Sequence, residues 1–264
     1  MPYDKIIWLS KGIAMEKVFK IFGKLLATFY GMFNDILGGI FIFALLVYMC
    51  MFFVNNKTIN NIYISELIKD DFDKTRKKTA KDKKKADNDT MKLLMSYGYS
   101  GFIGPFSFIL KSLFGVLMAF GISSEPMANA DKTIFNIDTS KNLLALKADG
   151  RTYFLAVIGL TIAAVFVQLL HDGYIERRIL MDQSAVDVFQ LLPLAIMCVY
   201  VPCGFIFFHI IYTVVEIVQV IFQTTTMHDS GIKRFQRTMN YKKTAFDRRY
   251  EEQVRNLNEK KKNR

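Results

Sequence analysis

Five polar side chains recur at helical spacing inside the last long apolar stretch of the chain: His209, Thr213, Glu216, Gln219 and Gln223. Steps of three and four residues place all five on one face of a helix. An ionisable group within a membrane helix is costly and commonly faces protein or water. One hypothesis is therefore a proton or ion pathway in which Glu216 titrates. The alternative is hydrogen bonding that holds this helix to its neighbours.

Three further polar residues lie inside or beside apolar stretches. Lys111 interrupts the apolar stretch 102–121. We expect its long side chain to extend to a membrane interface, with an ion pair to Glu216 as the alternative. His171 and Asp172 follow an apolar stretch directly, and we expect them to mark the end of a helix and the start of a loop.

Motifs of soluble enzymes are absent from the sequence. It contains no phosphate-binding loop, no Gly-rich dinucleotide fingerprint and no HExxH. Its three His are far apart, and its three Cys lie inside apolar runs, where a reduced thiol acts as a small hydrophobe. The sequence therefore predicts a protein that is not an enzyme, with no cofactor and no metal site.

Composition indicates where these polar residues lie. Hydrophobic residues make up 52% of the 264, and 24 are Phe, which is too apolar for an ordinary soluble surface. A membrane helix needs about 20 apolar residues, and four stretches supply them: 37–54, 102–121, 153–170 and 188–222. The last stretch is too long for one crossing and contains Pro193 and Pro202. We expect a break near Pro202, with a lead-in over 188–201 and a span over about 203–222.

The predicted fold class is all-α: a polytopic helical membrane protein with three to four transmembrane helices, an N-terminal amphipathic helix and a basic helical C-terminal tail. We expect helix packing at Gly38, Gly39 and Gly159. The predicted segments are an amphipathic segment (1–36), a transmembrane helix (37–54), a Lys-rich inner loop (55–98), a re-entrant or transmembrane segment (99–121), a connecting loop (122–152), a transmembrane helix (153–170), an outer loop (171–187), a Pro-broken segment with a transmembrane helix (188–223) and a basic inner tail (224–264).

The net charge of +11 is unevenly distributed. The loop 55–98 carries +4 and the tail 227–264 carries +7, whereas 171–187 carries −2. Because Lys and Arg are retained on the inner side, the two basic regions should share that side, opposite 171–187. This favours three spans, with 102–121 not fully crossing. The alternative is four spans with both termini inside.

Basic residues also suggest contacts with lipid headgroups. In 13–33, Lys17, Lys20 and Lys24 share one helical face, opposite an apolar face, as in a helix that lies on a membrane. The alternative is a helix packed on other subunits. Anionic phospholipid is a candidate partner for these residues and for a second cluster, namely Lys77, Lys78, Lys83, Lys84 and Lys85.

The preferred interpretation of the Lys-rich run 74–85 is a topology signal that also aids solubility. Nucleic acid is an unlikely partner, because no aromatic residue lies among these Lys to stack on a base. The tail 232–264 has a thin apolar stripe, which suits a solvated helix or docking on a partner.

The sequence thus predicts a non-enzymatic, multi-pass integral membrane subunit of a larger complex. The complex would be a secretion or translocation machine, or an assembly of the respiratory or synthase type. The membrane would be a bacterial inner membrane, or a mitochondrial or other eukaryotic membrane. Its partners would be other membrane subunits. The alternative function is an oligomeric channel or transporter that uses the polar face of the last helix.

Overall fold

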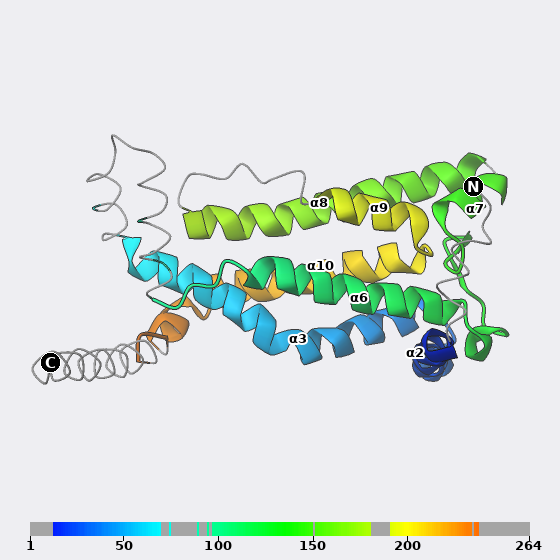
Figure 1. Ribbon diagram of the computed structural model, residues 1–264, viewed down its shortest axis with the longest axis horizontal. Coiled ribbons are helices and arrows are strands. Elements are labelled where there is room, and N and C mark those ends of the chain that lie inside the picture. The colour runs from blue at the N-terminus through cyan, green and yellow to red at the C-terminus, as the bar shows by residue number, and fades with distance from the viewer. Residues whose placement is uncertain are drawn as a thin grey trace, which may run out of the picture. The chain divides into compact units, whose positions relative to one another are not determined.

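The computed structural model describes residues 13–69, 74, 89, 94, 97–149, 151–180, 191–233 and 235–237. These residues are almost entirely helical, which confirms the predicted all-α class (Figure 1). The long helices are α2 (Ile13–Phe33), α3 (Ile36–Leu67), α6 (Ile103–Ile122), α8 (Arg151–Leu180) and α10 (Gly204–Thr225). The short elements are η2 (Glu125–Met127), β1 (Thr133–Ile134), β2 (Ile137–Asp138), α7 (Leu143–Asp149) and α9 (Leu192–Tyr200).

Within the described part of the chain, four helices are long and apolar enough to cross a membrane: α3, α6, α8 over Phe154–Ile175, and α10. Their outward faces expose large apolar side chains such as Phe53, Ile162 and Val218. In water this exposure would be unfavourable, whereas in a bilayer it is expected. The chain is therefore an integral, multi-pass membrane protein.

The chain divides into two compact units. The first unit comprises residues 1–55, 102–177 and 181–218, and the second comprises 56–101, 178–180 and 219–264. The cluster of Lys at 77, 78 and 83–85 and most of the basic tail lie outside the described residues, so the predictions about them remain predictions.

A sharp turn separates α2 from α3 in the first unit. Asn34 adopts a left-handed conformation with φ 51°, which ends α2. The Asp35 carboxylate then accepts hydrogen bonds from the N–H groups of Leu37 and Gly38, at 3.2 and 3.1 Å, and caps the start of α3. As a result α2 is seen nearly end-on in Figure 1, whereas α3, α6, α8 and α10 run across the view.

Helix α2 has the predicted bounds, and it crosses α6 near the C-terminal end of α6. The two backbones approach so closely that a Cβ atom at Gly121 would lie 3.0 Å from the nitrogen of Gly23. Lys20 forms ion pairs with Glu16 and Glu125, while Lys17 and Lys24 are exposed. Exposed Ile21 and Phe33 leave part of the apolar face unpacked, so lipid contact by α2 remains a prediction.

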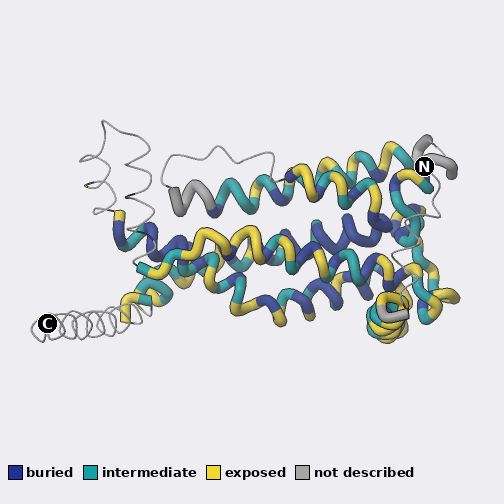
Figure 2. The backbone as a smooth tube through the Cα atoms, viewed as in Figure 1, coloured by how far each residue is buried: buried dark blue, intermediate teal, exposed yellow. Residues whose placement is uncertain are grey.

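The predicted break near Pro202 is confirmed. Helix α9 ends at Tyr200 and α10 begins at Gly204. The N–H groups of Cys203 and Gly204 donate to the carbonyls of Lys141 and Thr139, at 2.8 and 2.9 Å. The loop before α7 thus supplies acceptors for N–H groups at the start of α10. From residue 201 to 209 every residue is buried, as the dark stretch at the beginning of α10 shows in Figure 2.

The helices of the first unit run in defined directions relative to one another. Gly204 at the start of α10 lies against the side chain of Ile122 at the end of α6, so these two helices are antiparallel. His171, in the second half of α8, lies 4.0 Å from Glu216, in the second half of α10. Helices α8 and α10 therefore run the same way (Figure 1). The outer loop predicted at 171–187 remains a prediction, although α8 continues through the first ten residues of that range.

The second unit has its own small core. Ile64, Ile68 and Leu94 are buried, with Tyr97 and Phe235 packed against them. Hydrogen bonds add to this packing: the Tyr63 hydroxyl donates to the carbonyl of Gln223 at 3.0 Å, and Asn61 pairs with the backbone of Ser100.

Candidate functional site: a buried polar cluster

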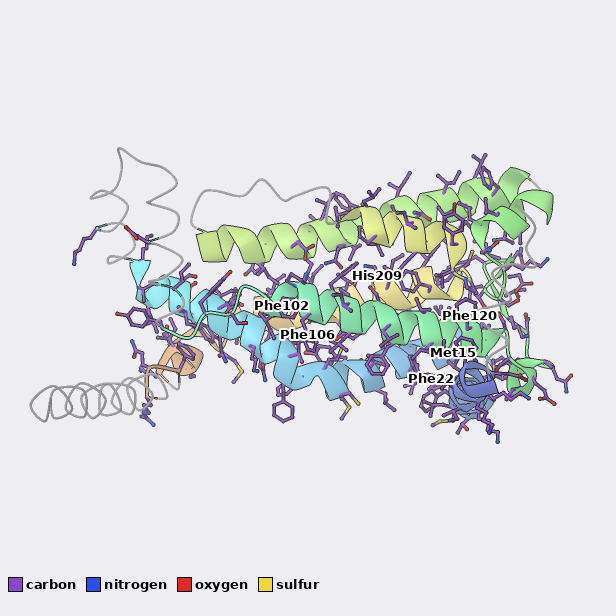
Figure 3. The ribbon with its side chains drawn as sticks, viewed as in Figure 1. Met15, Phe22, Phe102, Phe106, Phe120 and His209 are labelled. Carbon is purple, nitrogen blue, oxygen red and sulfur yellow. The ribbon has the colours of Figure 1, made fainter. Side chains whose placement is uncertain are left out.

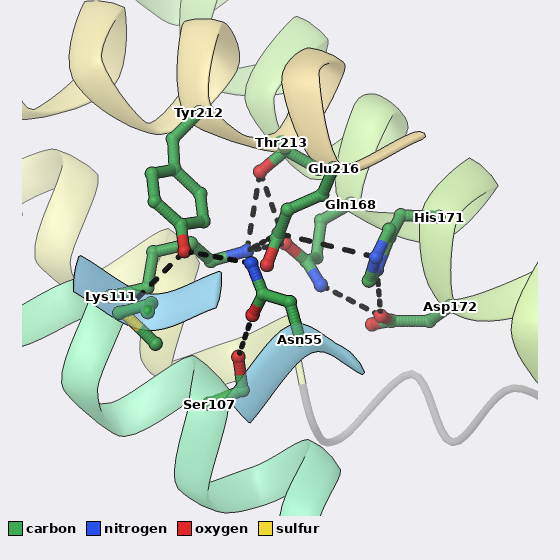
Figure 4. Close-up of polar contacts among 10 residues, drawn as sticks. Asn55, Ser107, Lys111, Gln168, His171, Asp172, Tyr212, Thr213 and Glu216 are labelled. Atoms are coloured by element: carbon green, nitrogen blue, oxygen red, sulfur yellow. Dashed lines mark hydrogen bonds and ion pairs between the residues drawn. The ribbon is translucent and has the colours of Figure 1, made fainter. Parts of the chain in front are cut away.

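Lys111 is the centre of a polar cluster inside the first unit. It lies midway along α6, and only 2% of its side chain is exposed. Its ammonium nitrogen is 3.0 Å from Glu216 Oε2, 3.0 Å from Gln168 Oε1 and 3.3 Å from Thr213 Oγ1 (Figure 4). Lys111 therefore does not extend to an interface. That expectation was wrong, because α8 and α10 provide acceptors at its own depth.

Helix α8 adds three polar residues to the cluster. Gln168 Nε2 donates to Asp172 Oδ1 at 2.8 Å, and the same oxygen lies 3.0 Å from His171 Nδ1. His171 Nε2 in turn is 4.0 Å from Glu216 Oε2. With Lys111 these contacts form a closed ring, which we call the Lys111 cluster: Lys111, Gln168, Asp172, His171, Glu216 and, bonded to the ammonium, Thr213.

Neighbouring residues of α3, α6 and α10 extend the polar contacts. Asn55 donates to the Tyr212 hydroxyl at 3.3 Å and accepts from the Ser107 hydroxyl at 3.3 Å. The Tyr212 ring also lies 5.5 Å from the Lys111 ammonium, a distance suited to a cation–π contact. Four helices thus contribute to one polar region between their apolar outer faces.

His209 is fully buried, and its ring is packed among aromatic side chains. It stacks on Phe205 at 5.9 Å and meets Phe108 edge-on at 6.4 Å between ring centroids. Figure 3 shows it on α10 beside α6. Neither ring nitrogen has a hydrogen-bond partner within the part of the chain that the structure describes.

The five residues predicted from their spacing all lie on α10, and their printed contacts differ. Thr213 and Glu216 belong to the Lys111 cluster, and His209 lies among aromatic rings. Gln219 and Gln223 belong to the second unit, where both donate to Asn56, at 3.3 and 3.4 Å. The structure therefore divides the predicted face into three environments.

His171 and Asp172 were missed as cluster residues. They do not end a helix, because α8 continues to Leu180. A signal was present in the sequence: Gln168, His171 and Asp172 are separated by three and one residues, so all three lie on one side of a helix. Only the partner helices show that this side meets Lys111.

A bundle of apolar helices around a network of charged and amide side chains defines a polytopic membrane protein with a polar site at membrane depth. The sequence model of the family described as 60Kd inner membrane protein matches residues 28–230, well over half of the chain. The chain belongs to this family. The match spans α3, α6, α8 and α10, and so includes the whole Lys111 cluster.

A comparison with curated proteins finds no match. No group of three or more His, Cys, Asp or Glu side chains in the described ranges is arranged to hold a metal ion.

Proposed function

We propose that this chain acts in membrane protein insertion, as the 60Kd inner membrane protein family suggests. The observation that supports this function best is the Lys111 cluster, a charged network between helices whose outer faces are apolar. A polar segment that enters a bilayer loses its hydrogen bonds to water, which costs several kcal/mol per unsatisfied group. A polar site at membrane depth offers substitute partners and lowers that cost. Binding alone lowers the cost of insertion, so this function needs no catalytic residue.

Reconstitution tests this proposal. The purified chain in liposomes would be given a single-span client with a short polar tail, and protease protection would report insertion. We expect insertion above the level of empty liposomes. The double variant Lys111→Met with Glu216→Gln should insert about fivefold less client, equivalent to losing hydrogen bonding worth about 1 kcal/mol.

Cys50→Ser is the matched control, because Cys50 is exposed on α3 and should leave insertion unchanged. Insertion equal to that of empty liposomes would refute the proposal. Equal activity of the double variant and the natural chain would remove the Lys111 cluster from the mechanism.

We also propose an orientation. Helices α3, α6, α8 and α10 each cross, and the segment between α8 and α10, which contains α9, returns the chain. The regions 55–98, 171–187 and 227–264 then share the inner side, and they hold most of the Lys and Arg outside the spans. The charge of Lys111 was the reason to expect that 102–121 does not fully cross. Because Glu216 pairs with this charge inside the protein, a crossing by α6 becomes favourable.

Single-Cys labelling tests this orientation, in a background without Cys50, Cys198 and Cys203. An impermeant reagent applied from outside should modify a Cys at Phe135 and spare Cys at Ala80, Leu180 and Asn258. Labelling of position 180 together with 135 would instead restore an outer loop at 171–187.

The partners predicted from the sequence belong to the same proposal. Exposed Lys17 and Lys24 on α2 suit anionic phospholipid, and the chain would work beside other membrane subunits or further copies of itself. Gentle extraction followed by mass measurement distinguishes a complex from a lone chain. In the alternative function, transport along the polar face of α10, Glu216→Gln would change ion flux into liposomes. Unchanged flux would exclude Glu216 from such a pathway.

A further inference from the structure

The β1–β2 hairpin between α6 and α8 carries a large aromatic side chain at its tip. Strands β1 and β2 pair Ile134 with Ile137, so Phe135 and Asn136 form a two-residue turn, and both have positive φ, 50° and 63°. Gly, Asn and Asp are the usual residues in such a turn, whereas a bulky side chain is strained there. Turn geometry thus favours a different residue at position 135. Because the Phe135 side chain is also 81% exposed, its presence points to a contact outside the chain.

The hairpin itself is held firmly to the helices of the first unit. Ile134 and Ile137 are buried in the core of that unit. At the base of the hairpin, the N–H group of Thr139 donates to the carbonyl of Lys132 at 2.9 Å, and the carbonyl of Thr139 accepts from the N–H group of Gly204 at 2.9 Å. The tip is therefore presented at a fixed place relative to the start of α10.

That place is close to the membrane surface. Gly204 is the first residue of the apolar helix α10, and it lies against Ile122, the last residue of α6. Phe135 is four residues before Thr139, which limits its distance from this level to about 13 Å at about 3.3 Å per strand residue. The headgroup layer extends about 5–8 Å beyond the hydrocarbon core on each side. The Phe135 ring is thus within reach of the lipid headgroups.

Other exposed aromatic side chains mark the same level. Phe33 is the last residue of α2, Phe120 lies in the last turn of α6, and Tyr200 is the last residue of α9. All three are exposed, and α2 crosses α6 near Gly121, so they lie at one end of the bundle (Figure 1). Aromatic rings are enriched where proteins meet the boundary between lipid and water. A lipid surface is therefore the partner that suits Phe135 best.

We propose that the tip of the hairpin inserts Phe135 into the lipid headgroup layer and so anchors the hairpin on the membrane. The ring, rather than charge, provides the attraction, because the two Asp and two Lys of 131–141 cancel. Binding of the tip should therefore not require anionic lipid. The anchor is independent of the insertion function, since it uses no residue of the Lys111 cluster.

Trp fluorescence tests the depth of the tip in the full chain. Trp8 is the only Trp of the sequence, so Phe135→Trp in a Trp8→Phe background is a single reporter. In liposomes of zwitterionic lipid, bromine near the headgroup should quench this Trp about twofold more than bromine deep in the acyl chain, as expected for a ring at the headgroup boundary. Ile162→Trp, at an exposed position midway along α8, is the control and should show the reverse order.

A second pair of variants removes or keeps the ring. An environment-sensitive label on Asn136→Cys, in a background without the three natural Cys, would report on the tip. Phe135→Asn suits the turn but lacks the ring, so the emission of the label should shift to the red, toward its value in water. Phe135→Tyr keeps a ring and should leave the emission unchanged. A Cys at position 135 also lacks the ring, so it stays open to the aqueous reagent used to test the orientation.

Quenching of the Trp by aqueous iodide, with no response to either brominated lipid, would overturn the inference and leave the tip in water, available to a protein partner. Stronger quenching by the deep bromine would overturn it as well, and so would unchanged emission of the label in Phe135→Asn. If Phe135→Trp does not fold, the label on the natural tip and on its Asn and Tyr variants decides alone.

Discussion

A close pair of acidic and basic side chains from each unit can be compared, and these two pairs differ mainly in burial. In the first unit, Lys111 and Glu216 lie 3.0 Å apart with 2% and 6% of their side chains exposed. In the second unit, His228 and Glu66 lie 2.6 Å apart with 30% and 23% exposed. The shorter contact is the more hydrated one.

Burial, rather than distance, therefore determines what each pair contributes. Removing one partner of a buried pair leaves a charge without water or counterion, which costs about 3–5 kcal/mol. A hydrated pair competes with water and is worth about 1 kcal/mol or less. We expect the first pair to be required for folding and the second to respond to pH.

Glu216→Gln should have the largest effect. The amide keeps the shape of the side chain but leaves Lys111 as an unmatched buried charge, so the free energy of unfolding should fall by about 3–5 kcal/mol. Equilibrium unfolding in mild detergent measures it. The double variant with Lys111→Met should recover most of the loss, and a double variant as unstable as Glu216→Gln would show that the lost charge balance is not the cause.

Gln168→Leu tests a neutral residue of the same cluster. It removes an acceptor from Lys111 and a donor from Asp172, and unsatisfied buried groups cost about 1–3 kcal/mol. Thermal unfolding should show a smaller loss of stability for Gln168→Leu than for Glu216→Gln. Gln168→Glu restores the acceptor but adds charge beside Asp172, and it should not restore stability fully.

Gly115→Ala separates packing from charge in the first unit. A Cβ atom at Gly115 would lie 2.7 Å from Phe208 Cδ1 and 2.9 Å from Phe205 Cδ2, so these rings or the helix that carries them must shift, at a cost of about 1–3 kcal/mol. Gly159→Ala is the control, because nothing lies within 4 Å of its Cβ position. If Gly115→Ala leaves the stability unchanged, the Lys111 cluster tolerates small shifts of its helices.

His228 should show the smallest effect, one that depends on pH. The hydrogen bond with Glu66 raises the pKa of His228 above its usual 6.5. The folded state therefore favours protonated His228, and its contribution is complete below about pH 6.5 and lost as the pH rises through the raised pKa. Because the pair is hydrated, we expect less than about 1 kcal/mol. Unfolding measured between pH 5.5 and 8.5 should reveal this pH-dependent part of the stability, and His228→Gln should abolish it.

Apolar runs and proline positions were enough to predict the long apolar helices from the sequence, but not α7, which lies in the predicted connecting loop 122–152. The bounds of α2 and the break at Pro202 follow from local patterns that tertiary contacts do not override. Helix length was underestimated for α3 and α8, since both continue into polar sequence beyond the apolar run.

The site was only partly predictable, because it depends on which helix faces meet. Spacing along α10 correctly grouped Thr213 with Glu216, but it could not show that Lys111 and Asp172 approach them from α6 and α8. The same limit applies to glycine: of the three predicted packing positions, Gly38 and Gly39 lie against the end of α2 but Gly159 meets open space, and close packing at Gly115 and Gly121 was not predicted.

The order of synthesis gives the Lys111 cluster a further consequence. Lys111 is made before all its partners, since Gln168 follows 57 residues later and Glu216 follows 105 residues later. At about 5–20 residues per second, the ammonium waits on the order of 5–20 s for its counterion. During that interval α6 carries an unmatched charge and should stay near the aqueous surface or the translocation machinery. Its final position is reached only when α10 emerges, so the second half of the chain completes the insertion of the first.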